Sequence, residues 1–177
     1  EMCIRDSLHD HVGGGFHRYS VDAEWRIPHF EKMLYNQAQL AQVYSQAYQY
    51  TQNPRFAQVA KHTFDFLLTQ RDSDTGGFFS ATDAESDGGE GKFYIWSYDE
   101  LESELSPSEF STAEAILGVT SQGNFEGDNV LWRRSDVEQQ TGKSVDQLLK
   151  KLAKLRQQRT PPAVDRKVIT AWNGLAL

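Results

Sequence analysis

Two stretches of the chain place apolar side chains along one side of a helix. The first lies between residues 31 and 52, where these side chains recur every three or four positions: Met33, Leu34, Ala38, Leu40, Ala41, Val43, Tyr44, Ala47 and Tyr48. The second covers residues 55–70, with one face formed by Phe56, Val59, Ala60, Thr63, Phe64 and Leu67. The spacing is that of amphipathic helices. Because Asn53-Pro54 separates the two runs, the pattern predicts an αα-hairpin, and Pro28 suits the first turn of its first helix.

A Gly-Gly-Phe segment occurs twice, at residues 14–16 and 76–78. The first belongs to a run of three glycines that predicts a tight loop with close backbone approach. The second follows the predicted hairpin. A helical hairpin and a Gly-Gly-Phe turn that recur at a fixed spacing are typical of an array of helical hairpins.

Shorter elements are expected further along the chain. Residues 78–81 and 92–96 resemble two strands on either side of an acidic loop, a short β-hairpin excursion. Serine-led patterns predict helix starts at Ser97, Ser106 and Ser144, the second helix ending near Gly118 and the third near Gln158. Residues 124–134 are expected to be extended, and a last helix is expected to start around Thr170.

Composition narrows the class of protein. The 177 residues carry 18 Lys and Arg against 25 Asp and Glu, a formal charge of −7, which argues against nucleic acid or an acidic membrane as a partner. Cys3 is the single cysteine, so a disulfide framework and a cysteine-based metal site are excluded. The sequence contains no apolar run of about 20 residues and no signal-peptide pattern, and the cytoplasm is the expected location.

The acidic loop after the second Gly-Gly-Phe segment has three interpretations. Asp83, Glu85 and Asp87 followed by Gly88 resemble the start of an EF-hand, but Tyr94 stands at the twelfth position, where a bidentate Glu is required. The alternatives are a solvated acidic turn and a pair of substrate-facing carboxylates formed by Asp83 and Glu85.

Four histidines fall within a short span around the first glycine run: His9, His11, His17 and His29. A metal site must be considered, although no cysteine accompanies them and the glycine loop offers no helix to fix the rings. A polar pocket with a neutral histidine as general base is a second interpretation. Ordinary hydrogen bonding at a loop–helix junction is the third.

Further polar and aromatic side chains are candidates for ligand binding. The predicted helix start gathers Arg18, Trp25, His29, Glu31 and Lys32, and a helix N-terminus favours anions. Trp25, Trp96, Trp132 and Trp172 lie in or beside turns, where indoles suit stacking on sugars and also the capping of cores.

Several of these motifs together resemble one family. The segments are 10–22 (DHVGGGFHRYSVD), 25–35 (WRIPHFEKMLY), 76–81 (GGFFSA), 90–96 (EGKFYIW), 123–127 (GNFEG) and 165–174 (DRKVITAWNG). They resemble spermatogenesis-associated protein 20 and its bacterial thioredoxin-domain-containing relatives. The resemblance covers residues 8–177. Residues 1–7 do not match and are expected to be a non-native leader, and His9 stands where relatives usually have Tyr.

The resemblance implies a mainly α fold. Family members carry a thioredoxin-like domain followed by an (α/α)6 six-hairpin barrel similar to N-acylglucosamine 2-epimerases and six-hairpin glycosidases. Residues 8–177 would then be the N-terminal part of that barrel, truncated at the C-terminus. The likeness to sugar enzymes is an analogy of fold.

Two functions follow as hypotheses. In the first, the barrel binds or converts a sugar-like small molecule without a cofactor or metal, in the manner of an epimerase or isomerase of carbohydrate metabolism. Its acid–base groups would be His11, His17, His29, Glu31, Asp83 and Glu85. Its substrate contacts would be Arg18, Trp25, Lys32, Lys92, Trp96, Trp172 and Asn173. In the second, a non-catalytic barrel binds a partner or client for the thioredoxin-like domain. Convergence of these side chains in one cavity would favour the first.

Overall fold

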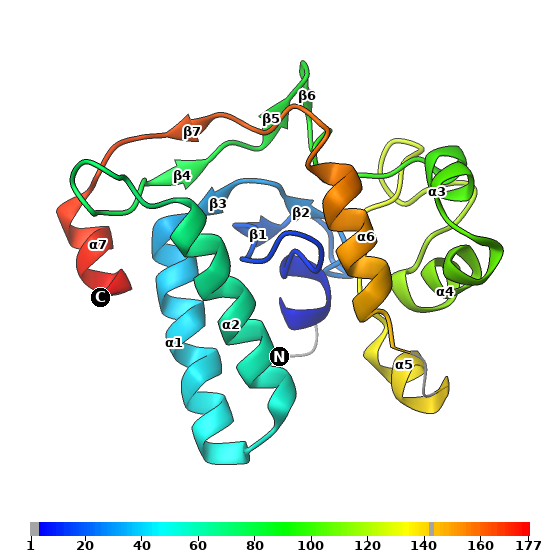
Figure 1. Cartoon of the computed structure of the whole chain (residues 1–177), viewed down its shortest axis with the longest axis horizontal. Coiled ribbons are helices and arrows are strands. Elements are labelled where there is room, and N and C mark those ends of the chain that lie inside the picture. The colour runs from blue at the N-terminus through cyan, green and yellow to red at the C-terminus, as the bar shows by residue number, and fades with distance from the viewer. Residues whose placement is uncertain (1–3, 142–143) are drawn as a thin grey trace.

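The predicted hairpin is present as two packed antiparallel helices. A computed structural model describes residues 4–141 and 144–177. In it, α1 (Leu34–Thr51) and α2 (Pro54–Thr69) lie side by side (Figure 1). Gln52 ends α1 in the left-handed region, and the Asn53 side chain accepts a hydrogen bond from the Arg55 N–H at the start of α2. Phe56, Val59 and Ala60 of α2 pack on Tyr44 of α1 in a shared core.

The expected helical start at Pro28 is wrong. Pro28–His29 forms strand β2, which pairs with β1 (Tyr19–Ser20), and Lys32–Met33 forms β3. The backbone of this segment bonds to other segments, and α1 therefore begins only at Leu34. His29, Glu31 and Lys32 thus lie on extended chain before the helix, and their positions owe nothing to the helix dipole.

Small antiparallel sheets cross one end of the helices. Strand β3 pairs with β4 (Ala81–Thr82), and β4 pairs with β7 (Val164–Asp165) (Figure 1). The β-hairpin was expected in the wrong place: residues 91–94 form a turn, Trp96 makes only an isolated bridge to Asn129, and the hairpin lies inside the acidic loop as β5 (Glu85–Ser86) and β6 (Gly89–Glu90). Gly91 N–H bonds the Ala84 carbonyl, which closes the loop earlier than the apolar pattern suggests.

The two Gly-Gly-Phe segments adopt the same turn. Asp10 N–H donates to the Gly15 carbonyl at 2.9 Å, and Asp72 N–H donates to the Gly77 carbonyl at 2.7 Å. Gly14 and Gly76 have φ values of 76° and 73°, which favour glycine. Within this repeat, α1 corresponds to α7 (Thr170–Ala176), and the two helices pack against each other. The Gly-Gly-Phe turn predicted to recur is therefore present twice, although strands and a helical lobe follow the second turn before α7 begins.

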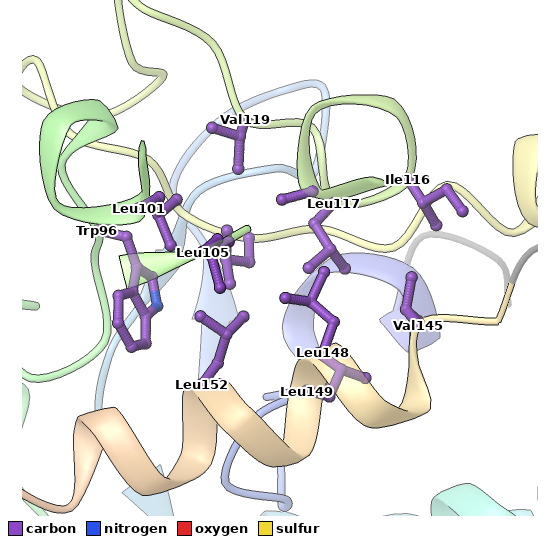
Figure 2. Close-up of a cluster of buried hydrophobic side chains, with 12 residues drawn as sticks. Trp96, Leu101, Leu105, Ile116, Leu117, Val119, Val145, Leu148, Leu149 and Leu152 are labelled. Atoms are coloured by element: carbon purple, nitrogen blue, oxygen red, sulfur yellow. The ribbon is translucent and has the colours of Figure 1, made fainter. Parts of the chain in front are cut away.

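The second repeat carries a helical lobe between β4 and β7. It contains α3 (Tyr98–Glu104), α4 (Pro107–Leu117), α5 (Ser135–Thr141) and α6 (Asp146–Arg156). Figure 2 shows leucines of α6 meeting side chains of α3 and α4 around the buried Trp96. Ser97 and Ser106 cap α3 and α4 as predicted. Helix α6 begins two residues after Ser144, whose hydroxyl accepts from the Asp146 N–H.

The chain is mainly α-helical with small antiparallel sheets, as expected. Residues 124–134 contain no helix and only isolated bridges, which agrees with the extended excursion. Near the start of the chain, Ile4–Leu8 forms a short π-helical turn, and Asp6 accepts hydrogen bonds from Arg133 N–H and Ser135 Oγ. The assignment of residues 1–7 as a non-native leader stays a prediction.

Candidate functional site

A network of charged side chains lies on the extended segment that precedes α1. Arg18 Nη1 donates to Glu31 Oε2 at 2.8 Å, and Arg18 Nε donates to the Tyr35 hydroxyl at 3.2 Å. The imidazole of His29 lies between two carboxylates, with Nε2 3.1 Å from Glu31 and Nδ1 2.8 Å from Glu90. All five side chains are partly accessible. The network therefore couples a histidine, two carboxylates and a guanidinium at a surface that a ligand can reach.

The pairing of β1 with β2 creates this network. Tyr19 lies opposite His29 in the register, and their rings stack with centroids 4.9 Å apart. Glu90 reaches His29 from β6, 61 residues further along the chain. Because the segment is extended, Glu31 and His29 point to the same side, which accounts for their contact.

An open pocket of about 510 Å³ adjoins the network at Arg18 and Tyr19. Its wall also contains the side chains of His17, Trp25 and Asn36, together with Leu8, Ser20, Asp22, Gln39, Leu40 and Val43. Aromatic faces combined with amide and hydroxyl groups are typical of sites for small polar ligands. His17, Arg18 and Trp25 are three of the residues proposed from the sequence.

Trp25 occupies a left-handed backbone conformation with φ of 59°. The loop around it is held by Asp22, whose carboxylate accepts hydrogen bonds from the N–H groups of Arg26 and Ile27 and from the Ser20 hydroxyl. Burial opposes ionisation of Asp22, yet these bonds hold its pKa below the usual value. A bulky residue with positive φ is strained, and such strain is found mainly where function requires it.

A second charged cluster is buried behind the first glycine turn. Lys32 Nζ donates to Asp10 Oδ2 and to the Gly14 carbonyl, both at 2.7 Å, and Arg156 Nη1 donates to both Asp10 oxygens at 2.8 and 2.7 Å. Burial would raise the pKa of Asp10, but Arg156 and Lys32 hold it well below the usual value. Burial lowers the pKa of Lys32, and Asp10 opposes that shift. Lys32 therefore belongs to a different site from His29 and Glu31.

His11 and His17 are buried and neutral. The Nε2 of His11 lies 3.0 Å from the Asp6 carbonyl oxygen, and burial lowers its pKa to about 4. The Nδ1 of His17 lies 3.0 Å from the Phe30 carbonyl oxygen, and burial lowers its pKa to about 3. Both rings line a cavity of about 20 Å³, room for one water molecule. His29 does not line it, so in the described part of the chain the three histidines share no common cavity.

The other residues proposed from the sequence lie apart from the network. Asp83 and Glu85 are exposed, and the Asp83 carboxylate accepts from the Glu85 N–H. Lys92 is exposed, with its Nζ 3.8 Å from Asp128. Trp96 is fully buried in the lobe core, under the guanidinium of Arg159 at 3.9 Å. The proposed residues therefore do not converge in one place.

The two candidates on α7 have distinct surroundings. Trp172 contacts Tyr35 edge to face, with ring centroids 5.0 Å apart, and so lies beside the network. Asn173 instead holds backbone: its side-chain amide bonds the N–H and the carbonyl of Phe78. The equivalent residue in the first repeat is Gln37, which holds the backbone of Phe16 in the same way.

The sequence analysis missed five residues of the two clusters: Asp10, Tyr19, Tyr35, Glu90 and Arg156. The repeat contains a signal for Asp10, because Asp10 and Asp72 occupy matching positions before the glycines. Glu90 and Arg156 come from distant segments, and their local sequence gives no sign of the contact. Among residues 4–141 and 144–177, no group of three or more His, Cys, Asp or Glu side chains is placed to hold a metal ion. No helix among them is long and apolar enough to cross a membrane.

Comparison with known proteins finds relatives over the whole chain. Human and mouse proteins named spermatogenesis-associated protein 20 are each 37% identical over 99% of this chain. An uncharacterised protein of Caenorhabditis elegans is 34% identical over all of it. The chain spans only 27–29% of the length of these relatives. No family model matches the sequence. The chain is thus similar along its length to proteins named spermatogenesis-associated protein 20, the family that residues 10–35 resemble.

Proposed function

We propose that the chain contributes a site for a sugar-like small molecule, built from Arg18, His29 and Glu31 with the adjoining pocket. One observation carries the proposal: Arg18 lines the pocket and at the same time pairs with Glu31, which contacts His29. A ligand in the pocket would therefore meet a guanidinium that is coupled to a possible acid–base pair.

Each group has a chemical role in this proposal. The rings of Tyr19 and Trp25 would stack on the apolar face of a sugar, and Asn36 would bond its hydroxyl groups. Arg18 would bind a carbonyl or carboxylate oxygen of the ligand. Once the ligand displaces Glu90 from Nδ1, that nitrogen of His29 would exchange a proton with a carbon next to that carbonyl, with Glu31 orienting the imidazole through Nε2. The reaction class would be an epimerisation or isomerisation.

The proposed setting is a six-hairpin (α/α)6 barrel in which α1 and α7 belong to the inner ring. The repeated Gly-Gly-Phe turn and the packing of α1 on α7 support it, because arrays of hairpins place equivalent helices next to one another. A thioredoxin-like domain in the same protein and a cytoplasmic location stay predictions from the sequence.

His29→Gln in the intact protein tests the proposal. The variant keeps the polarity and much of the volume, and the side chain is partly exposed, so the melting temperature should change little. Turnover of a panel of free hexoses and N-acetylhexosamines should fall at least about a hundredfold, the usual contribution of a general base to the rate. His62→Gln is the matched control, because His62 is a partly exposed histidine on α2 that is outside the network. A large loss of stability with unchanged turnover would assign His29 a structural role only.

A partner-binding role is the second candidate. The exposed apolar side chains of α1 and α2 favour it: Val43, Tyr50, Phe64 and Leu68. In that case the thioredoxin-like domain or its client would contact these helices, and Tyr50→Gln with Leu68→Gln, neither of which lines the pocket next to Arg18, would weaken the association while His29→Gln would not. Measuring both variants against the sugars and the separate domain distinguishes the two functions.

A further inference from the structure

A second cavity of about 340 Å³ opens beside the buried cluster of Asp10, Lys32 and Arg156. Its wall is formed by the first glycine turn, α2, β4, α6 and the segment before β7. Its lining shares no residue with the pocket next to Arg18. The cavity is therefore separate from the site proposed above.

The charges that line this cavity do not balance. Lys32 and Arg156 face a single carboxylate, that of Asp10, and the remaining lining residues are uncharged. All three charged side chains are at most 5% exposed. Buried cations without enough anionic partners are costly, and a ligand with one negative charge would complete the cluster.

One N–H donor of the Arg156 guanidinium makes no hydrogen bond within the described residues. Both of its hydrogen bonds to Asp10 start from Nη1, and Nε is buried with no hydrogen-bond partner among the described residues. A buried donor without a partner is destabilising, and such groups are rare in native proteins. A carboxylate or phosphate oxygen is the acceptor that a guanidinium edge binds best.

Apolar side chains line the cavity beside the charged cluster, with Lys32 Nζ 4.6 Å from the Phe66 ring centre and the Arg156 guanidinium 5.6 Å from that of Phe93. Phe66 belongs to α2, and the apolar lining also contains Pro161, Pro162 and Val164. A cavity of this size and lining accepts a small molecule with a compact ring or aliphatic body. Neither a polyphosphate nor an extended peptide has the shape and charge that this lining and the single surplus cation favour.

We infer that this cavity binds a small organic anion, whose carboxylate or phosphate group contacts Arg156 and whose apolar body lies against Phe66 and Phe93. The ligand would be a monoanion, and it would join the glycine turn to the helical lobe through α6.

Calorimetric titration of the intact protein with inorganic phosphate, benzoate and benzamide tests the inference. Benzoate or phosphate should bind with a Kd of about 10 mM or lower, and benzamide, the uncharged analogue of benzoate, should not bind. Stronger binding of benzoate than of phosphate would identify a carboxylate ligand, and the reverse would identify a phosphodiester, which carries a single charge.

Two variants locate the binding. Ala153→Phe fills the cavity from α6 without touching the charged cluster, and Arg156→Lys keeps the charge but removes the Nε donor. Each should weaken anion binding at least about tenfold. Gln147→Phe, at an exposed position of the same helix, should leave it unchanged. If Ala153→Phe does not fold, Arg156→Lys decides alone. Absence of binding by both anions, or equal binding by wild type and Arg156→Lys, overturns the inference.

Discussion

At the scale of single residues, burial decides the protonation of His11 and His17. Each ring donates one hydrogen bond to a backbone carbonyl oxygen at 3.0 Å and is otherwise surrounded by protein. Desolvation disfavours the imidazolium form, so the pKa values fall to about 4 and about 3. Nearby cations lower the two pKa values further, Arg133 at His11 and both Lys32 and Arg156 at His17, because they disfavour a positive charge on the imidazole.

These shifts predict acid lability. Because the pKa of each histidine is lower in the folded state than in the unfolded state, the unfolded chain binds protons first as the pH falls below about 6.5. Stability should be unaffected above pH 7 and should fall by up to about 3 kcal/mol for each histidine by pH 4. Urea unfolding of the intact protein at pH 7, 5.5 and 4 measures this loss.

Substitution separates the contribution of these histidines from general acid effects. His11→Gln and His17→Asn keep an amide near the bonded nitrogen but cannot titrate, so the double variant should lose much less stability between pH 7 and 4 than the wild type. His62→Gln serves as the comparison at a partly exposed histidine, where burial also lowers the pKa, and it should remove a smaller part of the loss. An unchanged pH dependence in the double variant would contradict the assignment.

The sequence predicted which residues carry polar chemistry better than it predicted which of them meet. His29, Glu31 and Arg18 were proposed together, and they are in contact. Lys32 was placed with them, but it is next to Glu31 in an extended segment and therefore points to the other side, where it meets Asp10. The error came from treating residues 28–33 as helical, since a helix would have kept neighbouring residues on more similar faces.

At the scale of elements, the glycine turns are fixed to α1 and α7 by amide side chains. Gln37 of α1 accepts from the Phe16 N–H at 2.7 Å and donates to the Phe16 carbonyl at 2.6 Å. Asn173 of α7 makes the same pair of bonds to Phe78. In both cases a side-chain amide makes the two hydrogen bonds that the backbone of a neighbouring strand would otherwise make. Periodicity predicted both helices, but no pattern in a single helix marks the amide as a backbone partner.

Gln37→Met tests this contact. The change keeps the volume but leaves one buried N–H and one buried carbonyl of Phe16 without partners, at a cost of about 1–3 kcal/mol for each group. We expect a loss of about 3 kcal/mol in the free energy of unfolding of the intact protein. Gln42→Met, at an exposed position of α1, should change it by less than about 0.5 kcal/mol. Equal effects of the two substitutions would show that the Gln37 bonds contribute little.

At the scale of the whole molecule, two packed units meet at charged contacts. The lobe of α3, α4, α5 and α6 has its own apolar core (Figure 2). It is joined to the first glycine turn by Arg156 with Asp10 and to the hairpin by Arg55 with Glu138. Most helices of both units followed from local apolar spacing and serine caps. Their relative placement depends on buried ion pairs between distant segments, which no local pattern encodes.

The 177-residue chain expressed alone should self-associate, because several apolar side chains of α1 and α2 face solvent: Val43, Tyr50, Phe64 and Leu68, the tyrosine 89% exposed. Apolar patches of a few hundred Å² promote association. Sedimentation velocity should show a weight-average mass that rises with concentration, and replacing Val43, Tyr50 and Leu68 with Gln should lower it, since these substitutions remove apolar surface without touching the shared core. A monomer with a sharp, cooperative melt at all concentrations would contradict the expectation, and it would also weaken the partner-binding role, which depends on the same surface.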